Sequence, residues 1–146
     1  MKAHKGFARN LACRADQYAT DDDSIAVASG YESIAATSGS WSTAATSGGD
    51  STAAASGFRS TATASGDRST AATSGDRSTA VVTGQDSVAV AAGENCSASG
   101  AIGCWLMLVE RDRIGRILDA KAVKVDGDEI KPGVLYTLRS GKVVTR

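Results

Sequence analysis

The stretch GDRSTAATSGDRSTA, residues 66–80, contains the segment GDRSTA twice, nine residues apart. The same nine-residue period extends outward in both directions, and nine copies without an insertion cover residues 24–104. Repeat position 1 is Ser in eight copies and Cys96 in the last, and position 3 is always Ala. Position 7 is Gly in eight copies and Ile102 in the ninth, whereas positions 8 and 9 vary. The repeat is therefore the feature that decides the fold.

Each repeat predicts a short strand followed by a turn. In an extended segment, positions 1, 3 and 5 point to one face and positions 2, 4 and 6 to the other. An unvarying Ala indicates a site with room for one methyl group, and we expect the Gly at position 7 to supply the backbone freedom of a turn. Strand and turn at a fixed period predict an all-β fold, a parallel β-solenoid or β-roll. Frequent Ser, Thr and Gly disfavour a helix, and the strict phase of the repeat argues against disorder.

Nine residues are too few to enclose a core, so we expect two repeats, about 18 residues, in each coil of the solenoid. This stacking predicts two columns of position 9 side chains, which run through Glu32, Asp50, Arg68 and Asp86 and through Trp41, Arg59, Arg77 and Asn95. In the first column opposite charges flank Arg68, and in the second Trp41 can cover Arg59 by a cation–π contact. One repeat per coil would instead stack three arginines in succession, which is unfavourable.

The composition divides the chain into an N-terminal strand or cap (1–23), the solenoid (24–104) and a C-terminal β-meander (105–146). At the N-terminus, KAHKGF is predicted as a short strand, with Phe7 and Leu11 packing on the first coil. The C-terminal segment holds most of the large apolar residues and covers the last open edge of the solenoid. Its predicted core consists of Trp105, Leu106, Leu108, Ile117, Val123, Val125, Leu135, Leu138 and Val143.

The charge pattern is typical of neither a nucleic-acid-binding nor a membrane protein. The chain has 16 basic and 16 acidic residues, and residues 105–146 carry nine basic against six acidic groups. No signal peptide or membrane-spanning stretch is recognisable, so we expect a cytoplasmic protein that binds neither a nucleic acid polymer nor a membrane. The sequence has three cysteines without C-x-x-C spacing, which favours free thiols. A Cys96–Cys104 disulfide forms only if the fold brings the two residues within bonding distance.

Groups that could carry catalysis are scarce. A histidine-dependent site could only centre on His4, near Cys13, and no motif for a metal or cofactor is present, so we expect no catalytic residues, no metal and no cofactor. Asp67 and Asp76 each precede an arginine, which predicts ion pairs. The outward groups able to hold a ligand are three arginines and three aromatic residues, and these six are the candidate ligand-binding residues: Tyr31, Trp41, Phe58, Arg59, Arg68 and Arg77.

Both ends and the repeat together resemble a family of bacterial and phage-encoded proteins of unknown function. The likeness rests on the opening MKAHKGF…LACRADQY, the S-x-A-x-x-S-G array and the run GAIGCWLMLVE with KAVKVDGDEIKPGVLYTLRSGKVV. This resemblance implies a phage or prophage origin and a location in the host cytoplasm. It identifies no catalytic residues. Longer members of the family carry a globular segment between the opening strand and the repeats. In this sequence only about a dozen residues separate the two. A looser likeness is to the left-handed rolls of trimeric adhesin heads.

These observations predict a non-enzymatic solenoid that serves as a structural or binding module, as a homo-oligomer. One alternative is a phage protein that sequesters a small anionic ligand, such as a nucleotide, through its arginines and aromatic residues. Another is an ice- or surface-binding protein that uses one flat column of threonines: Thr43, Thr52, Thr61, Thr70 and Thr79.

Overall fold

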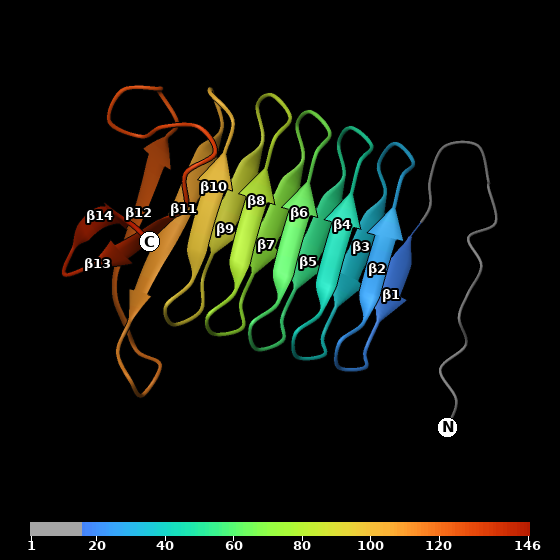
Figure 1. The fold of residues 1–146 in the computed structure, drawn as a ribbon, viewed down its shortest axis with the longest axis horizontal. Coiled ribbons are helices and arrows are strands. Elements are labelled where there is room, and N and C mark those ends of the chain that lie inside the picture. Colours follow the sequence, from blue (N-terminus) through green and yellow to red (C-terminus); the bar gives the residue numbers. More distant parts are fainter. Residues whose placement is uncertain (1–15) are drawn as a thin grey trace.

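A computed structural model describes residues 16–146, which form a flattened parallel β-solenoid closed at its C-terminal end by antiparallel strands (Figure 1). This confirms the predicted fold class. The described residues contain strands and no helix. The solenoid strands are β1 (Gln17–Ala19), β2 (Ile25–Ala28), β3 (Ile34–Thr37), β4 (Thr43–Thr46), β5 (Thr52–Ala55), β6 (Thr61–Ala64), β7 (Thr70–Thr73), β8 (Thr79–Val82), β9 (Val88–Ala91) and β10 (Ser97–Gly100). The predicted strand KAHKGF and its contacts lie outside the described residues.

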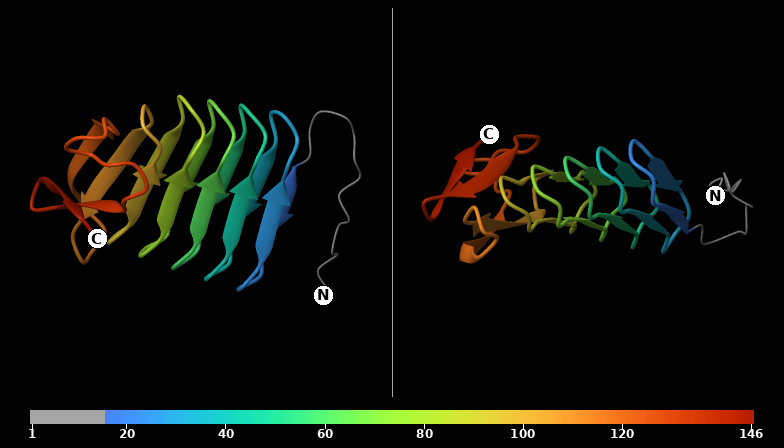
Figure 2. Two further views of the ribbon diagram at one scale, coloured as in Figure 1. Left: turned by 45° about the horizontal axis from the view of Figure 1, so that its top comes forward. Right: turned by 90° about the horizontal axis from the view of Figure 1, so that it is seen from below.

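Strands β1 to β10 alternate between two seven-stranded sheets, which the right-hand view of Figure 2 shows as two layers. Sheet A has the order β1-β3-β5-β7-β9-β11-β12, and sheet B the order β14-β13-β10-β8-β6-β4-β2. Within sheet B, Thr43 pairs with Thr61 and Thr61 with Thr79, a parallel register of 18 residues. The prediction of two repeats per coil is therefore confirmed.

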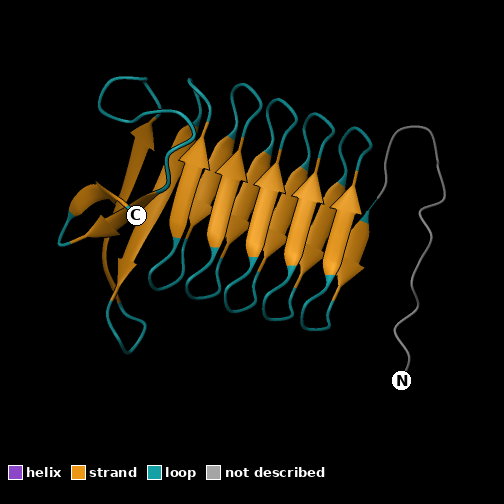
Figure 3. Cartoon of the chain, viewed as in Figure 1, coloured by secondary structure: helices purple, strands orange, loops and turns teal. Residues whose placement is uncertain are grey.

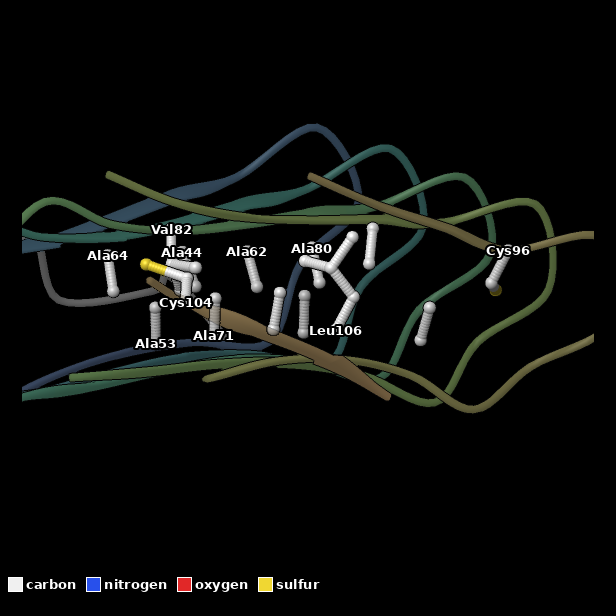
Figure 4. Close-up of a cluster of buried hydrophobic side chains, with 14 of the residues drawn as sticks. Ala44, Ala53, Ala62, Ala64, Ala71, Ala80, Val82, Cys96, Cys104 and Leu106 are labelled. Carbon is white, nitrogen blue, oxygen red and sulfur yellow. The ribbon is translucent and has the colours of Figure 1, made fainter. Parts of the chain in front are cut away.

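The interior is lined by methyl groups (Figure 4). Alanines at position 3, such as Ala44, Ala53 and Ala62, have no exposed surface, and the residues of β3 to β9 alternate between half-buried and buried. Position 5 also points inward and holds Ala or Thr, except for Val82 and Gly100. Two of these inward threonines, Thr37 and Thr46, have buried hydroxyls with no hydrogen-bond partner. The predicted single-methyl site at position 3 is confirmed.

The glycine at position 7 is required by close packing, so the prediction that it supplies turn freedom is wrong. Left-handed φ angles occur instead at position 9, for example 60° at Trp41 and 58° at Arg77. A Cβ atom on Gly48 would lie 1.9 Å from the carbonyl oxygen of Gly30, one coil earlier. Only glycine lets the turns of successive coils approach this closely.

The serine at position 1 joins successive coils by side-chain hydrogen bonds. The Ser60 hydroxyl accepts a hydrogen bond from the Ser42 N–H at 3.2 Å and donates one to the Gly39 carbonyl at 3.1 Å. Cys96 occupies the equivalent site, since its thiol donates to the Gly75 carbonyl at 3.0 Å. Cys104 makes the corresponding bond to the Gly84 carbonyl. The two thiols are buried and free, and they lie far apart across the roll, so the bridge left open by the sequence does not form (Figure 4).

The C-terminal strands form two antiparallel hairpins, one extending each sheet, instead of the single predicted β-meander. They are β11 (Trp105–Arg111), β12 (Ile117–Lys124), β13 (Tyr136–Arg139) and β14 (Lys142–Thr145). β11 is parallel to β9 and antiparallel to β12 in sheet A, whereas β13 is antiparallel to both β10 and β14 in sheet B. The Glu110 carboxylate ties the two parts together, because it accepts hydrogen bonds from the N–H groups of Ser140 and Gly141 at 2.7 and 3.0 Å.

The predicted core of this C-terminal part is only partly correct. Four of the nine residues are buried, and three others are partly buried: Leu106, Leu108, Val125 and Leu138, then Val123, Leu135 and Val143. Trp105 and Ile117 are 45% and 59% exposed. Trp105 pairs with Val88 and so takes an outward position on sheet A, and Ile117 lies at one end of the edge strand β12.

Candidate anion-binding site

The variable positions 8 and 9 lie in turns along the two long edges of the roll, drawn teal in Figure 3. Turns after the even strands β2, β4, β6 and β8 form one edge, which carries Arg68. Turns after the odd strands β3, β5, β7 and β9 form the other edge, which carries Arg59 and Arg77. The fold therefore divides the six predicted ligand-binding residues: Tyr31 and Arg68 on the first edge, and Trp41, Phe58, Arg59 and Arg77 on the second.

On the first edge, Arg68 is neutralised within the chain. Its Nε and Nη2 donate to the two carboxylate oxygens of Asp50 at 2.9 and 2.7 Å. The Tyr31 hydroxyl also donates to this carboxylate. The hydrogen bond from Arg68 lowers the pKa of Asp50, and the hydrogen bond to Asp50 raises the pKa of Tyr31. The predicted opposite-charge pairing of Arg68 is confirmed for Asp50, and it leaves little free charge for a ligand.

Asp67 and Asp76 do not pair with the arginines that follow them, so this prediction is wrong. The Asp67 carboxylate accepts a hydrogen bond from the backbone N–H of Gln85 at 2.7 Å, and Asp76 accepts one from Glu94 at 2.9 Å. Both donors belong to the next coil, 18 residues on. Stacked turns place a backbone N–H within reach of a position 8 carboxylate, and the arginines at position 9 are left available for other contacts.

On the second edge, aromatic rings support Arg59. Its guanidinium carbon lies 4.6 Å from the ring centroid of Trp41 and 5.6 Å from that of Phe58. The two rings meet edge to face, with centroids 6.5 Å apart and planes at 82°. The predicted cation–π contact is confirmed. Such a contact holds the guanidinium plane while leaving its charge and its N–H donors free.

The C-terminal strands complete a basic pocket of about 290 Å³ beside these residues. The lining is Arg59, Arg77, Asn95, Thr137, Arg139 and Arg146. β13 runs antiparallel to β10, with Ala98 opposite Tyr136, and this brings the β13 side chains toward the turn that carries Asn95. Arg146 is fixed by a 2.8 Å hydrogen bond from its Nη1 to the Ser97 hydroxyl.

Within residues 16–146, no carboxylate forms an ion pair with any of the four arginines of this pocket. The ion pairs in this part of the chain are Arg68–Asp50 and Arg116–Asp112, and neither touches the pocket. Two acids adjoin pocket residues in sequence: Asp76 accepts a hydrogen bond from the Glu94 N–H at 2.9 Å, and Glu94 accepts one from the Asn95 side chain at 3.1 Å. The pocket is therefore lined by four positive charges that no ion pair within residues 16–146 neutralises. Such an arrangement favours the binding of an anion.

Sequence reasoning did not find Arg139 and Arg146, although the basic excess of residues 105–146 was the available signal. That excess could not show which basic residues turn toward the solenoid. Their place depends on the pairing of β13 with β10, which joins segments far apart in the chain.

A second candidate region among residues 16–146 has no charged residue in its lining. A shallow groove of about 420 Å³ on the outer face of sheet A is lined by uncharged residues, chiefly alanine, serine and threonine, and by Tyr18 at one end. The predicted single column of threonines is wrong, because two repeats per coil separate them onto opposite sheets. Thr43, Thr61 and Thr79 lie in sheet B, and Thr52 and Thr70 in sheet A.

His4 and Cys13 lie outside the described residues. In the part of the chain that the structure covers, His, Cys, Asp and Glu form no group of three suited to a metal ion. These residues also include no helix with the length and apolar character needed to cross a membrane. No family model, curated protein or solved structure matches this chain.

Proposed function

We propose that this protein is a non-enzymatic β-solenoid binding module that holds a small anionic ligand in the basic pocket. The observation that carries the proposal is the convergence of Arg59, Arg77, Arg139 and Arg146 on one cavity, with no carboxylate paired to any of them in residues 16–146. Elsewhere on the roll, a comparable arginine, Arg68, is matched by Asp50.

The chemistry of the lining favours binding over turnover. A guanidinium group stays protonated throughout the physiological range, so it neither takes up nor releases a proton during a reaction. Its planar set of N–H donors fits the oxygen atoms of a phosphate or carboxylate. Asn95 and Thr137 add neutral donors. The pocket thus supplies charge and hydrogen bonds, and it lacks a general base.

Mutual repulsion among the arginines gives the proposal a measurable consequence. Four like charges around one cavity oppose the folded state, and a bound anion relieves the repulsion. A ligand that binds only the folded chain also raises its stability by mass action. We therefore expect phosphate or pyrophosphate to raise the melting temperature, and we expect added sodium chloride to weaken the effect by screening.

The test uses calorimetric titration of the full chain with phosphate, pyrophosphate and citrate at low salt. We expect Arg77→Ala and Arg139→Ala to weaken binding at least tenfold. Arg68→Ala is the matched control, because it removes the same charge from the same repeat position on the opposite edge. Failure of all three anions to bind, or an equal loss in Arg68→Ala, contradicts the proposal.

Homo-oligomerisation stays a prediction made from the repeat composition. Light scattering of the purified chain tests it, and a mass of one chain, 14.8 kDa, at high concentration would contradict it.

A further inference from the structure

We infer that the ligand is a phosphate ester carrying a planar ring, with the phosphate in the basic pocket and the ring stacked on Arg59. The inference rests on the proposed function and names the ligand class of the same site. Arg59 has two roles here: it lines the pocket, and its guanidinium lies over the Trp41 ring.

The repeat sets the spacing of this site. The position 9 N–H groups of Trp41, Arg59 and Arg77 each donate to a carbonyl in the next coil, at 2.8–2.9 Å. Side chains of this column are therefore spaced like neighbouring strands, about 4.8 Å apart. One such step separates Arg59 from Arg77, and a single sugar ring can bridge it. A phosphate held by Arg77 and Arg139 would then leave an attached base above Arg59.

Arg59, Trp41 and Phe58 form a surface on which a planar ring can stack. Trp41 is 54% exposed and Phe58 is 43% exposed, although large aromatic side chains normally bury most of their surface. Their edge-to-face contact holds the two rings, and Trp41 holds the Arg59 guanidinium. A guanidinium plane stacked on an aromatic ring on one side can accept a nucleobase on the other.

The charge distribution favours a monoester over a polymer. Nucleic acids bind along extended positive tracks, and their binding requires several successive phosphate contacts. Here four arginines surround one cavity of about 290 Å³, and the Trp41 and Phe58 rings lie against the guanidinium of one of them, Arg59. One phosphate and one ring match this arrangement.

The experiment compares three probes that differ by one part each: inorganic phosphate, ribose 5-phosphate and adenosine 5′-monophosphate. Calorimetric titration gives the affinities, and Trp105→Phe leaves Trp41 as the one tryptophan for fluorescence. We expect the nucleotide to bind at least tenfold more tightly than ribose 5-phosphate, which is the size of effect expected for one stacked base. We also expect the nucleotide alone to change the Trp41 emission.

The variant Trp41→Asn tests the stacking surface without disturbing the turn, because Asn95 occupies the same repeat position with the same left-handed φ. It should abolish the advantage of the nucleotide, measured as the ratio of the affinities for adenosine 5′-monophosphate and ribose 5-phosphate within the same variant. Equal affinity for the two esters, or an advantage that survives Trp41→Asn, overturns this inference while the proposed anion site stands. Failure of all three probes to bind overturns both.

Discussion

A pair of adjacent glycines tests the packing account most sharply. Gly48 occupies position 7, where a Cβ atom would lie 1.9 Å from the Gly30 carbonyl oxygen and 2.5 Å from its carbon. Both clashing atoms belong to the backbone of the preceding coil, so no side chain can rotate away. At Gly49, the next residue, a Cβ atom would meet its nearest neighbour, Tyr31, at an ordinary 3.5 Å.

The expected effects of alanine at the two sites have opposite signs. Gly48→Ala must separate two coils by more than 1 Å, which is overpacking at its upper range, so it should cost about 3 kcal/mol. Neither glycine has a left-handed φ. Gly49→Ala should therefore stabilise the fold by about 0.5 kcal/mol, because alanine reduces the entropy of the unfolded chain.

Thermal unfolding followed by circular dichroism measures both effects. For a chain of this size, about 3 kcal/mol corresponds to a fall of roughly 10 °C in melting temperature. Urea midpoints provide a second measure. A Gly48→Ala protein as stable as the parent would refute the close-approach argument. Loss of stability in Gly49→Ala, equal to that in Gly48→Ala, would show that both glycines serve the turn conformation instead.

Three further predictions concern hydrogen bonds in the coils, and urea unfolding checks each of them. Ser60→Ala should cost about 1–3 kcal/mol, because it leaves the buried N–H of Ser42 without an acceptor, and an unchanged midpoint would contradict the serine bridge. Thr46→Val should stabilise the fold by about 1 kcal/mol, since the Thr46 hydroxyl is buried and unpartnered; destabilisation would show that this hydroxyl has a partner. Asp50→Asn should lower the urea midpoint at pH 7. The pKa of Asp50 is lowered in the fold, so its contribution is present above the ordinary value of 3.8 and is lost as the pH falls through the folded value. The difference from the parent should therefore vanish in strong acid, and a difference that persists there would contradict the pairing with Arg68.

Much of the fold could be predicted because the repeat expresses it directly. The constant Ala at position 3 indicated an interior that accepts one methyl group, and the position 9 charges distinguished two repeats per coil from one. The contacts of Arg68 with Asp50 and of Arg59 with Trp41 followed from the same register. These features depend on periodicity alone, which a sequence shows.

Features that depend on distances between coils could not be predicted. A turn glycine that recurs in each repeat looks the same whether it is needed for its φ angle or for a close approach, and only the 1.9 Å separation at Gly48 distinguishes the two. The preference of Asp67 for a backbone N–H over the adjacent Arg68 likewise depends on the spacing of stacked turns. The contribution of Arg139 to the pocket required the pairing of β13 with β10.

The columns, the two edges and the basic pocket all follow from the packing of two repeats into each coil. Engineered disulfides test it directly, in a Cys13→Ser background. Thr43 and Thr61 are register partners in neighbouring strands, about 4.8 Å apart, which suits a disulfide. Thr43 and Thr52 lie on opposite sheets. We expect Thr43→Cys/Thr61→Cys to form an intramolecular disulfide on mild oxidation and Thr43→Cys/Thr52→Cys to form none. The reverse result, with the nine-residue pair forming the bond, would contradict the packing of two repeats into each coil.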